Sequence, residues 1–163
     1  MTGKTARQEM FIAKRVQALA VMYLTRRRDL LVETAAEDIG FDLVVRLVLP
    51  EKDGVRQFGV KLAGALTKQH ADKVLRRCVE QTQKHGPFAF PICTFFFGME
   101  DNQGCYTWIA APVVRTEKAL LHMPPDPDCK PLGKAALGAL VAQVDRWYDA
   151  FFDNLLTTSG GRV

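Results

Sequence analysis

The sequence predicts a single-domain α/β sandwich with a central mixed sheet, in the order α-β-β-α-β-β-α. Three segments repeat apolar residues at spacings of three and four, which is typical of helices that pack on a sheet. Four further segments are apolar or alternate between apolar and polar residues, as strands do. The 163 residues contain no internal repeat and suit one hydrophobic core. The expected helices are 6–24, 67–85 and 133–156, and the expected strands are 41–49, 55–63, 88–98 and 105–114. Residues 30–33, "LLVE", are interpreted as a short extended piece.

We expect residues 1–156 to form this domain and residues 157–163 to form a mobile C-terminal tail. No apolar run reaches the roughly 18 residues that a membrane span needs. The first apolar segment is interrupted by Lys14 and Arg15, unlike a signal peptide. The sequence therefore predicts a cytoplasmic protein with no membrane partner. Its net charge of +4 permits binding to nucleic acid without requiring it.

The first helix carries Phe11, Val16 and Leu19 near one face and charged residues on the other. The second helix is more polar, with a narrow apolar stripe, and Gly86-Pro87 ends it. Residues 88–98 are apolar on both faces, which indicates a buried central strand. We therefore expect the aromatic residues of the last two strands, Phe95, Phe97 and Trp108, to lie in the core. Residues 122–131 contain four prolines and are predicted to form a loop.

The last helix has an unusually wide apolar stripe. Burial of this stripe against the sheet accounts for it, and a homodimer face formed by residues 133–156 is the alternative. The stripe comprises Leu137, Leu140, Val141, Val144, Trp147, Tyr148, Phe151, Phe152 and Leu155.

The two strands around the turn "PEKDG" are expected to pair as a hairpin. Because side chains alternate along a strand, only one register keeps the polar and apolar faces apart. That register pairs Asp42 with Lys61, Val44 with Gly59, and Arg46 with Gln57. Lys61 then points at Asp42 at the end of the hairpin far from its turn. An ordinary cross-strand ion pair of this kind stabilises a sheet by about 0.2–1 kcal/mol.

The residues around this pair resemble a known family. "DIGFD", at 38–42, is followed nineteen positions after Asp42 by Lys61 in the strand "FGVK". This pattern resembles the PD-(D/E)XK nuclease superfamily, also called restriction-endonuclease-like. It is closest to an uncharacterised bacterial branch with a D-x-G-I-D strand entry and a Q-x-K second strand. The resemblance covers about residues 6–114.

The resemblance implies a restriction-endonuclease-like fold and hydrolysis of phosphodiesters with Mg²⁺ or Mn²⁺. By position, Asp42 and Lys61 would be catalytic residues, and Glu9 on the first helix could join them. Asp42 would hold the metal, and Asp38 in the preceding loop could supply a further oxygen. The lysine would position the attacking water or offset charge in the transition state. Two residues before Lys61, however, stands Gly59, where the family has a metal-binding acid or amide.

Three interpretations of function stay open on the sequence. The first is a nuclease-fold protein that is catalytically impaired and acts as a binding or interaction module. The second is a metal-dependent DNA or RNA endonuclease with a rearranged active site. The third is an unrelated structural α/β domain. If the protein is inactive, no cofactor is expected.

The basic run Arg26–Arg28 is interpreted as a solvated helix end or, alternatively, as a contact to nucleic-acid phosphates. The four cysteines lack the spacing of a zinc site. They are Cys78, Cys93, Cys105 and Cys129, and we expect them to be small core or surface residues.

Overall fold

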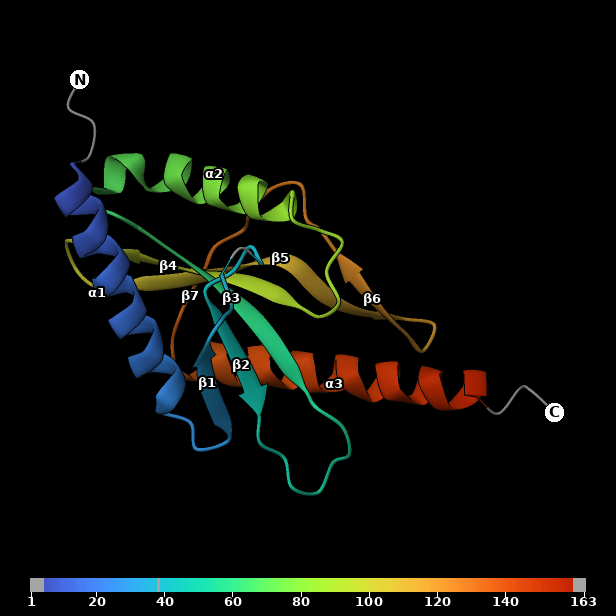
Figure 1. Cartoon of the computed structure of the whole chain (residues 1–163). Helices are drawn as coiled ribbons and strands as arrows, with labels where there is room; N and C mark the ends of the chain where they lie inside the picture. Colours follow the sequence, from blue (N-terminus) through green and yellow to red (C-terminus); the bar gives the residue numbers. More distant parts are fainter. Residues whose placement is uncertain (1–4, 38, 160–163) are drawn as a thin grey trace.

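The computed structural model describes residues 5–37 and 39–159, with the backbone alone at 158–159. It is a mixed α/β fold with a seven-stranded mixed sheet and three helices (Figure 1). The strands lie in the order β1-β2-β3-β4-β5-β6, and β7 pairs with β5. The elements are α1 (Ala6–Thr25), β1 (Leu30–Thr34), β2 (Leu43–Leu47), β3 (Gln57–Ala65), the 3₁₀ turn η1 (Lys68–His70), α2 (Ala71–Gln83), β4 (Ile92–Gly98), β5 (Gly104–Arg115), β6 (Lys118–His122), β7 (Lys130–Pro131) and α3 (Lys134–Ser159).

The sheet separates two hydrophobic clusters, so the fold has three layers. α1 and α3 pack on one face, around a core that includes Val16, Phe58 and Leu140. α2 covers the other face through Leu75 and Val79. Figure 1 shows α2 on one side of the strands and α3 on the opposite side. β3 and β4 run parallel because α2 connects them across the sheet, whereas the other strand pairs are antiparallel.

The local sequence explains where the first helix begins. Thr5 and Gln8 form a capping box: the Thr5 hydroxyl accepts the Gln8 N–H at 3.2 Å, and the Gln8 side chain accepts the Thr5 N–H at 2.9 Å. Ile12 and Val16 then face the sheet. This places Glu9, near the start of α1, beside residues 61–64 of β3, at the site described below.

The predicted strands and helices are present, but the chain forms more strands than the four that were expected. β1 coincides with the short extended piece noted at 30–33, whereas β6 and β7 were missed. β1 and β6 lie at the two ends of the sheet, and their residues are less apolar than those of β4. α3 also continues to Ser159, three residues into the predicted tail, and residues 160–163 lie outside the described part.

The wide stripe of α3 is largely buried within the chain. Solvent hardly reaches Leu140 and Val144, and the side chains of Trp147 and Tyr148 are also buried. The Tyr148 hydroxyl donates to the Gln57 carbonyl oxygen at 2.6 Å, and burial raises the pKa of Tyr148 to about 12. Burial against the sheet thus accounts for the stripe as far as Tyr148, and the homodimer remains a prediction.

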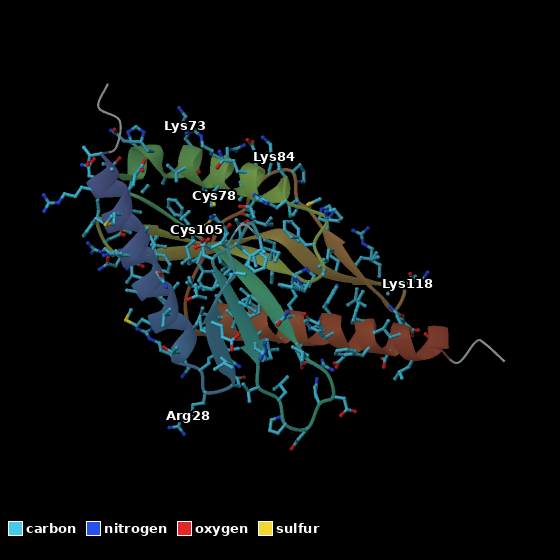
Figure 2. All side chains as sticks on the ribbon, in the orientation of Figure 1. Arg28, Lys73, Cys78, Lys84, Cys105 and Lys118 are labelled. Carbon is cyan, nitrogen blue, oxygen red and sulfur yellow. A yellow bond between two sulfur atoms is a disulfide. The ribbon has the colours of Figure 1, made fainter. Side chains whose placement is uncertain are left out.

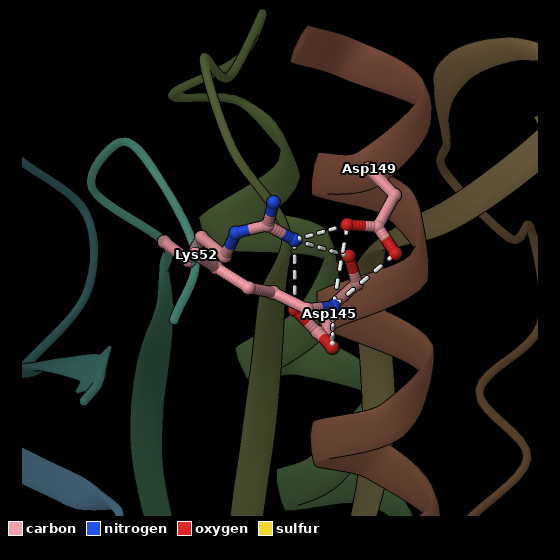
Figure 3. A network of polar contacts seen from close by, with 4 residues as sticks. Lys52, Asp145 and Asp149 are labelled. Atoms are coloured by element: carbon pink, nitrogen blue, oxygen red, sulfur yellow. Dashed lines mark hydrogen bonds and ion pairs between the residues drawn. The ribbon is translucent and has the colours of Figure 1, made fainter. Parts of the chain in front are cut away.

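A charged network joins α3 to the hairpin turn (Figure 3). The Arg56 side chain, 6% exposed, donates to the Asp145 and Asp149 carboxylates at 2.7 Å each. Lys52 reaches the same two carboxylates, Asp145 at 2.6 Å. Since Lys52 lies within the turn and Arg56 lies just after it, this network fixes the end of the hairpin far from Lys61.

Two cysteines form a disulfide, which corrects the expectation that all four would be ordinary core or surface residues. Cys105 at the start of β5 is bonded to Cys129, which ends the proline-rich loop. The loop also contacts α2: Gln83 Nε2 donates to the Pro124 carbonyl at 3.0 Å, and Arg76 lies 3.5 Å from Asp126. The disulfide therefore holds a segment that crosses α2.

The aromatic residues of the central strands are core residues, as predicted. Phe95 and Phe97 are inaccessible to solvent, and Trp108 is partly buried against the same cluster. Within the described residues, no helix is both long and apolar enough to span a bilayer.

Candidate phosphate-binding groove

The Asp42–Lys61 pair forms as the hairpin register predicted. Val44 pairs with Gly59 and Arg46 with Gln57. Asp42 and Lys61 lie two residues from Val44 and Gly59, away from the hairpin turn, and are therefore opposite each other on the same face. Lys61 Nζ lies 3.5 Å from Asp42 Oδ2. Both side chains are about one-third exposed, at 32% for Lys61 and 38% for Asp42. Solvent can therefore reach the pair.

Asp42 is also part of the backbone framework. Its Oδ2 accepts the Leu62 N–H at 2.7 Å, and its own N–H donates to the Val60 carbonyl at 2.9 Å. One carboxylate oxygen thus serves both the strand and the lysine. The Asp42 carboxylate therefore cannot rotate away from Lys61 without losing its hydrogen bond to the Leu62 N–H.

Two adjoining cavities meet at Lys61. The larger, about 690 Å³, extends between β3 and α2, and the smaller, about 360 Å³, lies between α1 and β3 beside Asp42. Glu9, Lys61 and residues 62–64 line both, and Asp42 lines the smaller one. We call this joined depression the α2 groove. The structure therefore brings Glu9, Asp42 and Lys61 to one depression, as expected, with Glu9 at its rim.

The α2 wall of the groove is basic. One flank of this helix, which is about 20 Å long, lines the larger cavity together with His70 before the helix and His85 after it. Lys73 and Arg77 lie one turn apart on this flank, and both are exposed. Together with Lys61 they give three positive charges, opposed among the described lining residues of the two cavities by Glu9 and by Asp42, which pairs with Lys61. Such a surface attracts anions.

Sequence reasoning missed this flank because it assigned no role to the polar side of the second helix. The available signal was the spacing of Lys73 and Arg77, four positions apart beside the apolar stripe that carries Val74 and Cys78. Which side of the polar face meets β3 depends on the packing of α2, which the helix sequence alone does not specify.

The basic run Arg26–Arg28 lies elsewhere. Arg26 caps the far end of α1, about 25 Å along the helix from Glu9. Arg26 stacks over Tyr23, and Arg27 pairs with Asp29 at 2.7 Å; this hydrogen bond raises the pKa of Arg27 and lowers that of Asp29. Figure 2 shows Arg28 at the end of the molecule opposite Lys73. The helix-end interpretation fits these contacts, and the structure does not bring the run to the groove.

Cys78 faces the groove from α2, beneath the helix in Figure 2. Burial raises the pKa of its thiol, and the nearby Lys61 charge only partly opposes this. A thiol with a raised pKa is a poor nucleophile at neutral pH. Cys78 therefore lines the groove near Lys61 without acting as a nucleophile.

The residues present do not make up the metal-ligand set that the resemblance implies. Among the described residues, no three His, Cys, Asp or Glu side chains are grouped so that they could hold a metal ion. Asp42 offers one carboxylate with one oxygen already bonded, and Gly59 offers no side chain. Asp38 lies outside the described residues. Mg²⁺ prefers near-octahedral oxygen coordination, for which this set supplies little.

Comparisons with family models, curated proteins and solved structures find no match to this chain. The assignment of function therefore depends on the geometry of the groove.

Proposed function

We propose that this protein is a nuclease-fold binding module that has lost metal-dependent catalysis and holds the phosphate backbone of a nucleic-acid strand in the α2 groove. One observation carries the proposal. The Asp42–Lys61 pair opens into a groove whose α2 wall is basic, while the metal ligand expected two residues before Lys61 is missing. A site of this kind attracts phosphates without supplying the means to cleave them.

The order of elements supports the nuclease-like part of the proposal. α1 precedes the hairpin, Asp42 and Lys61 lie on neighbouring strands, and α2 leads to β4, which is parallel to β3. The resemblance implied a helix before the hairpin and another after the lysine. The fold alone does not assign a function, because function belongs to the site.

The shape and charge of the groove favour a single strand as ligand. Phosphates of a single strand could follow the flank of α2, meeting Lys73 and Arg77 in succession with Lys61 on the opposite wall. Salt-dependent contacts to phosphates are the general basis of sequence-independent nucleic-acid binding. A cavity of about 690 Å³ is within the size range of small-molecule sites, so a nucleotide of a flexible single strand could enter it.

The test compares two double variants that remove the same charge. Lys73→Gln/Arg77→Gln changes the groove, and Arg26→Gln/Arg28→Gln changes the far end of α1. Binding of a fluorescently labelled single-stranded oligonucleotide is measured by anisotropy in EDTA. We expect the groove variant to bind many-fold more weakly than wild type and the control variant to bind like wild type. Equal losses in both variants would leave only a general effect of net charge and refute the groove.

A metal-dependent endonuclease with a rearranged site is the second candidate, and the position of Glu9 favours it. Glu9 lines the same two cavities as Lys61, so a carboxylate is available on the opposite rim. Cleavage of plasmid DNA or RNA by wild type with Mg²⁺ or Mn²⁺, abolished by Glu9→Gln, would establish this alternative.

A further inference from the structure

The side of the Asp42–Lys61 pair next to Gly59 is closed by apolar groups. A Cβ atom at position 59 would lie 2.6 Å from Ile92 Cδ1 and 2.9 Å from Phe41 Cδ2. Real Cβ atoms do not approach other atoms so closely. Gly59 is thus more than a missing ligand, because the space that a ligand would need is already filled.

Neither neighbour can move aside freely. Ile92 is inaccessible to solvent and belongs to the cluster beneath α2. Phe41 packs edge to face against Phe90, with ring centroids 5.7 Å apart. The backbone before Phe41 is fixed as well: Gly40 has φ 95°, and its Cα faces the His85 side chain, where a Cβ would lie 2.8 Å from Cγ. The turn at Gly40 therefore directs the Phe41 ring to Gly59.

We infer that Phe41 determines the specificity of this site by occupying the position of a second metal ligand. The Phe41 ring, together with Ile92 Cδ1, keeps any side chain at position 59 out, so that Asp42 is left to pair with Lys61 alone. The site is thereby open to anions on the groove side and closed to a divalent cation on the Gly59 side. The inference rests on the proposed function and adds that a carboxylate at position 59 is not enough to restore metal binding.

The experiment measures thermal unfolding of wild type, Gly59→Asp, and Gly59→Asp combined with Phe41→Ala and Ile92→Val, each in EDTA and in Mn²⁺. Because overpacking of a core is destabilising, Gly59→Asp should unfold about 5 °C or more below wild type, with no response to Mn²⁺. The combined variant lacks both the Phe41 ring and Ile92 Cδ1, the two groups that a Cβ at position 59 would meet. The carboxylate then has room beside Asp42, so Mn²⁺ should raise the melting temperature of this variant by several degrees. Gly133→Ala, at a glycine with nothing within 4 Å of the added Cβ, is the control for a simple loss of glycine.

A second comparison keeps the inference testable if the aspartate variants do not fold. Gly59→Ala and Phe41→Ala are combined, and the loss of melting temperature in the double variant should be clearly smaller than the two single losses together. Additive losses, or a Gly59→Asp variant that is as stable as wild type or binds Mn²⁺ by itself, would overturn the role of Phe41. Those outcomes leave the proposed function intact. Binding of Mn²⁺ with cleavage by wild type would instead refute the proposed function.

Discussion

Lys61 Nζ lies 3.5 Å from the same Asp42 oxygen that accepts the Leu62 N–H at 2.7 Å. This shared oxygen links the charge of the groove to the backbone of the sheet. Asp42 holds the entry of β2 against β3 and at the same time neutralises part of the charge that Lys61 would present to a ligand. In a metal enzyme the same carboxylate would instead be needed for the cation.

Replacing Asp42 by asparagine separates these two roles. The amide oxygen can still accept the Leu62 N–H, but the negative charge beside Lys61 is lost. We therefore expect Asp42→Asn to keep the wild-type melting temperature within a few degrees and to bind a single-stranded oligonucleotide more tightly. Anisotropy titrations measure the affinity, with Lys61→Met as the matched variant that should bind more weakly. A catalytic metal site predicts the reverse for Asp42→Asn, namely loss of metal-dependent binding.

The dependence of affinity on salt should report the number of phosphate contacts. For a single strand, the slope of log K against log salt concentration is about −0.7 for each phosphate neutralised. Removing Lys73 and Arg77 should thus make the slope less steep by about 1.4. The Arg26→Gln/Arg28→Gln variant should retain the wild-type slope. A slope that is unchanged in the groove variant would place the contacts on another surface.

Reduction of the Cys105–Cys129 disulfide should destabilise the fold. The bond closes a loop with a sequence separation of 24, for which the chain-entropy model gives about 3–4 kcal/mol. We expect dithiothreitol or Cys129→Ser to lower the melting temperature by about 10 °C. Cys78→Ser is the control and should keep the response to reductant. Titration of four free thiols in the denatured, unreduced chain would show that the bond does not form in solution.

Acid should weaken the network that anchors the hairpin turn. Burial acts to raise the pKa of Asp149, but the hydrogen bonds from Arg56 and Lys52 outweigh it and hold the pKa below the ordinary 3.8. The stabilisation is therefore fully present above pH 3.8 and is lost as the pH falls through the lower pKa of the folded state. Melting temperatures recorded from pH 6 to pH 3 should fall more in wild type than in Asp149→Asn. Parallel curves for the two proteins would contradict this role.

The sequence predicted the helices, the central strands and the hairpin register, because each depends on a local repeat of apolar residues. The contact between Asp42 and Lys61 follows from that register alone. The same reasoning identified β1 only as a short extended piece and did not find β6 and β7, which are short strands with exposed residues. It also missed the disulfide, since the spacing of Cys105 and Cys129 gives no sign of their meeting.

The surroundings of Gly59 could not be predicted from the hairpin. Ile92 comes from β4, which follows the crossover through α2, and Phe41 reaches the site only because Gly40 turns the chain. The missing ligand is visible in the sequence, but the filling of its space is a property of the tertiary packing. For the same reason, the position of Lys73 and Arg77 beside the groove follows only from the packing of α2 on the sheet.

The central claim is that the α2 groove binds a nucleic-acid strand without a metal and without cleaving it. The most direct test measures binding of a labelled single-stranded oligonucleotide to wild type in EDTA and in Mg²⁺, and then examines the recovered strand on a denaturing gel. Our account predicts a complex in EDTA, no more than a modest weakening in Mg²⁺ from competition of the cation for the phosphates, and an intact strand in both. A complex that forms only with Mg²⁺, or a strand that is cut, would contradict it.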